Sequence, residues 1–85
     1  MAARWAFYGE RVLWEIREAS GDVQEDFRTL MYELTKDPRR AGLGVLPLKD
    51  GTGGQYSVPF DNAVLVYEIL ADHPWIHLLH VAWTD

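Results

Sequence analysis

The stretch from residue 54 to residue 83 constrains the fold of this chain more than any other. It predicts three consecutive strands, at 55–60, 63–71 and 75–83, joined by two turns that are too short for crossover connections. We therefore expect an antiparallel meander. A strand with one face in water alternates apolar and polar residues, but the second and third strands are apolar at both sets of alternating positions. A sheet of such strands needs a cover on both of its faces.

The remainder of the chain supplies a cover for only one face. Apolar spacing and breaker residues predict short strands at 4–8 and 43–49 and helices at 10–19 and 22–34. Asp22 is the expected N-cap of the second helix, and Pro38 stops that helix. The sequence thus predicts one α+β domain, residues 1–85, in the order β-α-α-β-β-β-β. A helical hairpin packs on one face of an antiparallel sheet.

The apolar second face of the sheet has two explanations, which the sequence leaves open. The central strands of a small sheet can be apolar on both sides and partly shielded by loops. Alternatively, the second face accepts a segment of another chain, because large exposed apolar patches usually mark such sites. The candidate partner-binding residues are Val64, Val66, Leu70 and Trp83. Both a homodimer and a different protein would satisfy this pattern.

Charge argues against a nucleic-acid surface on the sheet. The chain has a net charge of −5, and Lys49 is the only basic residue after position 42. Affinity for nucleic acid depends largely on cations that contact phosphate. Direct binding of nucleic acid to the sheet is therefore not expected, and any RNA contact would come from the helical half.

Composition also bounds the compartment and the possible cofactors. The chain contains no cysteine, which excludes disulfides and thiolate sites and suits a reducing cytoplasm. No apolar stretch approaches the ~18 residues of a membrane span, and the N-terminus lacks the apolar core of a secretory signal. We expect a cytoplasmic protein with no membrane contact, no metal and no cofactor.

The histidines are the main candidates for chemistry. His77 and His80 lie three apart on one predicted strand, so they should point to opposite faces and could share a metal ion only across a bulge. His73 lies in a predicted turn. His77, His80 and Glu68, together with Tyr67, are possible general acid or base groups for RNA cleavage. Such cleavage also needs cations to stabilise the phosphorane, so the sequence leaves enzymatic activity open.

Several landmarks occur in an order that resembles the RelE/ParE toxin superfamily of bacterial toxin–antitoxin pairs. They are Trp5-Ala6-Phe7, Leu34-Thr35-Lys36-Asp37-Pro38, Leu46-Pro47-Leu48, Gly54-Gln55-Tyr56, Leu65-Val66-Tyr67-Glu68-Ile69 and Ile76-His77-Leu78-Leu79-His80-Val81. The resemblance implies two helices on an antiparallel sheet and an antitoxin segment that wraps the toxin. It also implies either ribosome-dependent mRNA cleavage or inhibition of gyrase.

The chain departs from the cleaving members of this superfamily at their basic positions. Those members place lysines and arginines on the strands, where this chain has Ser57, Pro59 and Val64, and a basic residue near the position of Thr84. The sequence ends at Asp85, before a terminal tyrosine. The resemblance therefore implies a divergent toxin-family component without strong nuclease activity, which binds an antitoxin-like protein or a second copy of itself. The alternative is an active ribosome-dependent mRNA endoribonuclease with atypical catalytic residues.

Overall fold

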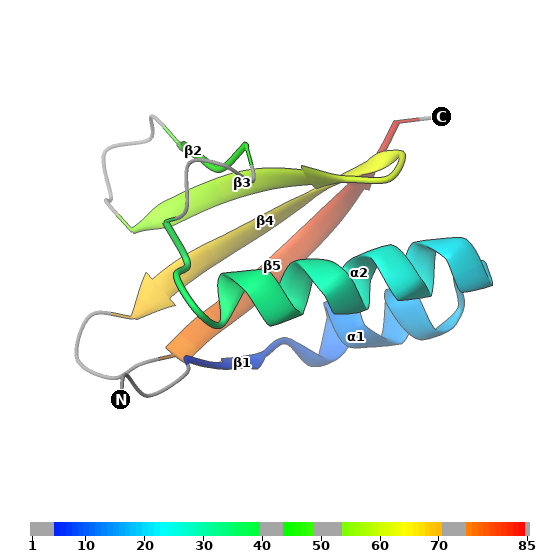
Figure 1. Cartoon of the computed structure of the whole chain (residues 1–85), viewed down its shortest axis with the longest axis horizontal. Helices are drawn as coiled ribbons and strands as arrows, with labels where there is room; N and C mark the ends of the chain where they lie inside the picture. The colour runs from blue at the N-terminus through cyan, green and yellow to red at the C-terminus, as the bar shows by residue number, and fades with distance from the viewer. Residues whose placement is uncertain (1–4, 40–43, 49–53, 71–74, 85) are drawn as a thin grey trace.

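Two helices pack on one face of a five-stranded sheet in the computed structural model, which describes residues 5–39, 44–48, 54–70 and 75–84 (Figure 1). The elements are β1 (Ala6–Tyr8), α1 (Glu10–Arg17), α2 (Gly21–Leu34), β2 (Leu46–Pro47), β3 (Gln55–Phe60), β4 (Ala63–Leu70) and β5 (Trp75–Trp83). The predicted α+β class and element order are confirmed.

The sheet has the strand order β1-β5-β4-β3-β2. The three strands β3, β4 and β5 form the expected antiparallel meander. The sheet as a whole is mixed rather than antiparallel, because β1 pairs in parallel with β5. This follows from the path of the chain. The helices carry the chain from β1 to the far edge of the sheet, and the meander returns to β1 with its last strand running in the same direction.

The predicted strand at 43–49 is shorter in the structure, at Leu46–Pro47, and its outermost positions lie outside the described residues. This strand is the edge opposite β1. Pro47 fits that place, because proline lacks the N–H that a central strand would use. The tight turn between β3 and β4 is as predicted, with Asp61 at a positive φ of 49°.

Two local features set the positions of the helices. Gly9 precedes α1 with a φ of 153°, and a Cβ atom there would lie 2.6 Å from the Cβ and the carbonyl oxygen of Leu78. Ser20, and not the predicted Asp22, caps α2, since its hydroxyl accepts the N–H of Val23 at 3.4 Å. Ser20 has the extended backbone typical of an N-cap residue, and α1 ends at Arg17 rather than at the predicted residue 19. Neither described helix has the length and apolar character needed to cross a membrane.

The core lies between the helices and the inner face of the sheet. It is formed by Val12 and Ile16 of α1, by Val23, Phe27, Leu30, Met31 and Leu34 of α2, and by Val58, Phe60, Ala63, Leu65, Tyr67, Ile69, Ile76, Leu78 and Val81 of the strands. The apolar stripe predicted for α2 is therefore buried as a unit. The Tyr67 hydroxyl donates a hydrogen bond to the buried carbonyl of Pro38, which fixes the chain after α2 to the sheet.

A bulge in β5 changes which side chains face the core. Val66 pairs with His80, but the next residue of β4 pairs with Leu78, so Leu79 is an extra residue in β5. Strict alternation stops at this point. Leu78 and Val81 both face the helices, whereas His77 and His80 both face away from them. The prediction that His77 and His80 point to opposite faces is therefore wrong.

Candidate functional site on the outer face of the sheet

The face of the sheet away from α1 and α2 is the candidate functional site, and we call it the outer face (Figure 1). All five strands contribute side chains to it. They are Ala6 and Tyr8 of β1, Trp75, His77, His80 and Ala82 of β5, Val64, Val66, Glu68 and Leu70 of β4, Gln55, Ser57 and Pro59 of β3, and Leu46 of β2.

A histidine–carboxylate pair lies near the β1 edge of this face. His77 is directly opposite Glu68, and its Nδ1 lies 2.8 Å from Glu68 Oε1. The ring of Tyr8 is nearly parallel to the imidazole, with 4.5 Å between centroids and 6° between planes. The side chains of His77 and Glu68 are 34% and 30% exposed, so both stay within reach of a ligand.

This geometry defines the orientation of the imidazole. An ionised carboxylate can only accept a hydrogen bond, so Nδ1 of His77 holds the proton that Glu68 accepts. When the imidazole is neutral, Nε2 is left as its hydrogen-bond acceptor. A histidine held in one tautomer and one orientation by a carboxylate and a stacked ring is suited to general-base chemistry. The structure thus brings two of the four candidate acid–base residues, His77 and Glu68, into direct contact.

The other candidates for chemistry are not in contact with the His77–Glu68 pair. His80 is exposed on the outer face opposite Val66, in the row of residues next to the His77–Glu68 pair. Tyr67 points into the core, where burial raises the pKa of its hydroxyl above the ordinary value and Tyr56 raises it further. Tyr67 is therefore not an acid–base group for a ligand on the outer face. His73 lies outside the described residues.

An apolar strip runs along β4 on the same face. Val64, Val66 and Leu70 are half-buried there, interrupted only by Glu68. Ala82 flanks Val64, and Trp75 flanks Leu70, across the β4–β5 ladder. Three of the four predicted partner-binding residues are therefore neighbours on one surface.

The fourth predicted partner-binding residue, Trp83, is not part of that surface. The bulge at Leu79 turns the end of β5 over, so Trp83 lies on the helix side and lines a hollow beside α1. The apolar–polar alternation of the sequence does not reveal that Trp83 lies on the other face, because nothing in that alternation marks the bulge at Leu79.

Positive charge is absent from the described strands. The described cations are Arg11, Arg17, Arg28, Lys36 and Arg39, and all of them lie on α1, on α2 or shortly after α2. Ser57, Pro59 and Val64, the positions at which the family resemblance implied cations, face outward. The described outer face therefore offers an acid–base pair and an apolar strip, but no cation for a phosphate.

A metal centre is not among the features of this site. Across the described ranges, no three histidine or carboxylate side chains lie close enough together to hold an ion. His77 and His80 lie on the same face, but no third histidine or carboxylate among the described residues lies close enough to complete a metal site with them.

Comparison with known proteins places the fold. No protein-family model matches the chain, and no curated protein matches it by sequence. The chain is similar to one in the RelE–RelB complex of Pyrococcus horikoshii, with 18% identity, a TM-score of 0.79 and coverage of 100% of this chain and 98% of that chain. It is also similar to one in the RelBE2 toxin–antitoxin complex of Mycobacterium tuberculosis, with 16% identity, a TM-score of 0.76 and coverage of 94% and 98%.

A third similar structure is the isolated RelE toxin of Escherichia coli, with 21% identity, a TM-score of 0.74 and coverage of 99% of this chain and 86% of that chain. At these identities the likeness establishes the fold. The chain has the RelE-like fold that its sequence landmarks implied.

Proposed function

We propose that this chain, which has the RelE fold, is the toxin-family component of a toxin–antitoxin pair and acts mainly through protein–protein binding. The proposal depends on the apolar strip of Val64, Val66 and Leu70, which has no second layer over it among the described residues. Exposed apolar strips of this kind usually mark contacts with other proteins. The similar structure from M. tuberculosis is a toxin–antitoxin complex and that from P. horikoshii is a RelE–RelB complex, which supports a partner of the antitoxin class.

The absence of cations from the described strands supports binding over strong nuclease activity. A phosphate surface needs lysine or arginine, and the outer face has neither within the described residues. An antitoxin-like polypeptide would instead bury the strip and pair with the polar groups around it. The proposal also places the protein in the bacterial cytoplasm, a reducing compartment that suits a chain without cysteine.

The test is co-expression of this chain with the product of the adjacent reading frame, followed by purification through a tag on one of them. We expect a stable complex. Val66→Asp, which puts a charge into the strip, should weaken it by about tenfold or more. Thr29→Asp is the control, because Thr29 is exposed on α2 and receives the same charge.

A homodimer is the alternative occupant of the strip, and light scattering of the purified chain distinguishes it. If Val66→Asp dissociates a dimer, the partner of the strip is a second copy. A chain that stays monomeric at high concentration and binds no neighbouring gene product would refute the proposal.

The His77–Glu68 pair supports a second candidate function, an atypical ribosome-dependent mRNA endoribonuclease. Nε2 of His77 would remove the proton of an RNA 2′-hydroxyl, and the 2′-oxygen would attack the adjacent phosphorus. The 5′-oxygen of the next nucleotide would leave as a hydroxyl with a proton taken from water, and a 2′,3′-cyclic phosphate would remain. The ribosome would have to supply the cations that stabilise the phosphorane.

Induction of the chain alone tests this candidate. Growth arrest and mapped cuts in mRNA should appear, and His77→Ala should abolish both. His80→Ala should have the smaller effect, because His80 is not hydrogen-bonded to Glu68 in the structure. Unchanged growth with intact mRNA would exclude nuclease activity and leave the binding function as the one to pursue.

A further inference from the structure

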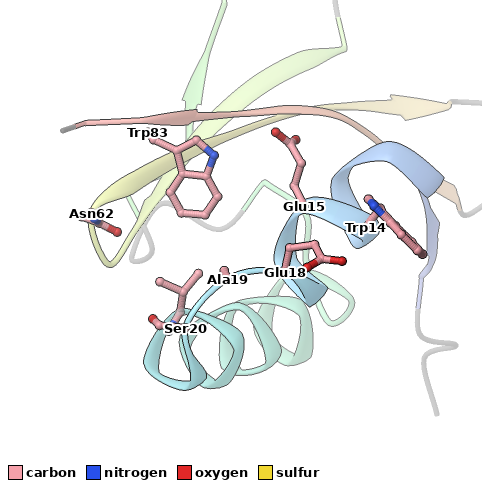
Figure 2. A pocket seen from close by; sticks show the side chains of 8 residues that line it. Trp14, Glu15, Glu18, Ala19, Ser20, Asn62 and Trp83 are labelled. Carbon is pink, nitrogen blue, oxygen red and sulfur yellow. The ribbon is translucent and has the colours of Figure 1, made fainter.

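A hollow of about 560 Å³ lies on the helix side of the sheet, away from the outer face. It is bounded by the end of α1, the start of α2 and the turn between β3 and β4, with Trp83 of β5 forming one wall (Figure 2). Nothing in the proposed binding at the outer face uses this hollow.

Trp83 is held firmly at the rim. The backbone N–H of Thr84 and its hydroxyl both donate to the carbonyl oxygen of Asn62, at 2.9 and 2.6 Å, and fix the end of β5. Because of the bulge at Leu79, the indole projects from the strand toward the helices (Figure 2). Trp83 is 38% exposed, so the hollow has an aromatic wall that is accessible from solvent.

The lining of the hollow combines apolar surface with negative charge. Ala19 and Val23 line its apolar part together with Trp83. Glu15 of α1 and Glu18, the residue that follows α1, also line the hollow (Figure 2). The described lining contains no lysine or arginine. Neither carboxylate has an ion pair with a described cation. The site is therefore an apolar groove with two carboxylates available to a ligand.

Neither of the described arginines of α1 forms an ion pair with these carboxylates, although Arg11 lies one helical turn before Glu15 and borders a neighbouring hollow with it. Arg17 lies over the ring of Trp14, with its guanidinium carbon 5.6 Å from the ring centroid. Trp14 is 59% exposed and borders the far side of the hollow (Figure 2). The indole of Trp83 has no such cation among the described contacts, so its face is available for a cation–π contact.

Charge complementarity selects the occupant. A phosphate or an acidic peptide would be repelled by Glu15 and Glu18, whereas arginine or lysine can bond to the carboxylates and lie against an indole. The net charge of −5 also favours the approach of a basic segment. An apolar residue one helical turn from such a cation would fit the surface between Trp83 and Val23.

We propose that this hollow docks a basic amphipathic segment of a protein partner, with arginine or lysine at Glu15 and Glu18 and an apolar side chain against Trp83. The inference rests on the proposed function in one respect, that the partner is a protein. Beyond the proposed function, it specifies that the docking segment is basic and amphipathic, and that it binds on the side of the sheet opposite to the outer face.

The test uses two synthetic amphipathic peptides of about 14 residues, roughly four helical turns, one with arginine on its polar face and one with glutamate at the same positions. Each is titrated into the full-length ¹⁵N-labelled protein. The basic peptide should give saturable shifts at the Trp83 indole N–H and at residues 15–23, and added salt should weaken them. Glu15→Gln with Glu18→Gln should lower the affinity about fivefold.

The control is Glu25→Gln with Asp26→Asn, which makes the same change in net charge on an exposed part of α2. Its affinity should match that of the unaltered protein. The amide substitutions keep side-chain size, and circular dichroism confirms that each variant is folded. The inference is overturned if the basic peptide fails to bind saturably, if both peptides bind equally, or if the Glu15/Glu18 variant binds like the control.

The Val66→Asp variant separates this inference from the proposed function. If it loses the partner but still binds the basic peptide at Trp83, both proposals stand. If the outer face has no partner but the hollow binds the basic peptide, only the proposed function fails. Shifts confined to the outer face would overturn the hollow while leaving the proposed function intact.

Discussion

The hydroxyl of Tyr67 is a sensitive point in the fold, because one buried oxygen joins the sheet to the chain after α2. The Tyr67 side chain is 0% exposed, and its hydroxyl donates to the carbonyl of Pro38, which is also buried. The ring stacks on Tyr56 with 5.8 Å between centroids. Tyr67→Phe keeps the ring and this stacking, and removes only the hydroxyl.

The expected cost follows from the loss of that single bond. A typical hydrogen bond contributes about 1 kcal/mol net, and a buried carbonyl left without a donor adds to the loss, so we expect the free energy of unfolding to fall by about 2 kcal/mol. For a domain of this size, such a change lowers the melting temperature by about 11 °C. Urea unfolding followed by tryptophan fluorescence measures the free energy directly, and calorimetry measures the temperature.

The same substitution should also change how the free energy of unfolding depends on pH in alkaline solution. Burial raises the pKa of Tyr67 in the folded state, so the phenol is neutral in both states below about pH 10 and contributes no pH dependence there. Above that pH the unfolded chain loses the proton first, and folded stability falls by about 1.4 kcal/mol per pH unit. The difference between the unaltered protein and Tyr67→Phe should therefore shrink as the pH rises from about 10 to 11. A difference below about 0.5 kcal/mol at neutral pH, or one independent of pH, would refute this account of Tyr67.

Three further tests of the fold compare the free energy of unfolding in urea between the unaltered protein and its variants. Gly9→Ala should cost about 2–4 kcal/mol, since its Cβ would lie 2.6 Å from Leu78 at a φ of 153°, and near-neutral stability would contradict that packing. Ser20→Ala should lower the free energy of unfolding by about 1 kcal/mol, and Ser20→Asp should lower it much less, because aspartate can also cap the helix. Equal losses would mean that Ser20 does not accept the N–H of Val23. Leu65→Ala should lower the free energy of unfolding by about 2–5 kcal/mol, because Leu65 is fully buried. Val66→Ala should lower it by about 1 kcal/mol, because Val66 is only half-buried, and similar losses for the two would indicate that the outer face is covered.

Much of the fold follows from the sequence because it depends on local signals. The apolar stripe of α2 is buried as predicted, and the strands at 55–60 and 75–83 have the predicted bounds. The turn at Asp61 is short and has the residue type that tolerates positive φ. The parallel pairing of β1 with β5 depends on how the helices cross the sheet, so the antiparallel prediction for the whole sheet failed.

The N-cap of α2 could not be assigned from the sequence, because two nearby residues could serve. Ser20 and Asp22 both have side chains that cap helices well, so the sequence prediction of Asp22 was wrong by two residues. The structure selects Ser20, because α1 and α2 are joined by so few residues that the chain must turn there. The candidate site shows the same limit. The sequence identified His77 and Glu68 as titratable groups, but their contact requires the β4–β5 register.

The bulge at Leu79 is the reason why the two surfaces of this protein differ so strongly in chemistry. If β5 had no bulge and Leu79 were paired like its neighbours, strict alternation from Leu78 would send His80 and Ala82 into the core and turn Val81 and Trp83 outward. The core would then bury an imidazole, and the outer face would gain an indole. With the bulge, Val81 fills the core, His80 joins His77 on the outer face, and Trp83 forms the wall of the acidic hollow. The polar character of one surface and the aromatic character of the other therefore have a common origin in one unpaired residue, so a change in the β4–β5 register would alter both binding surfaces together.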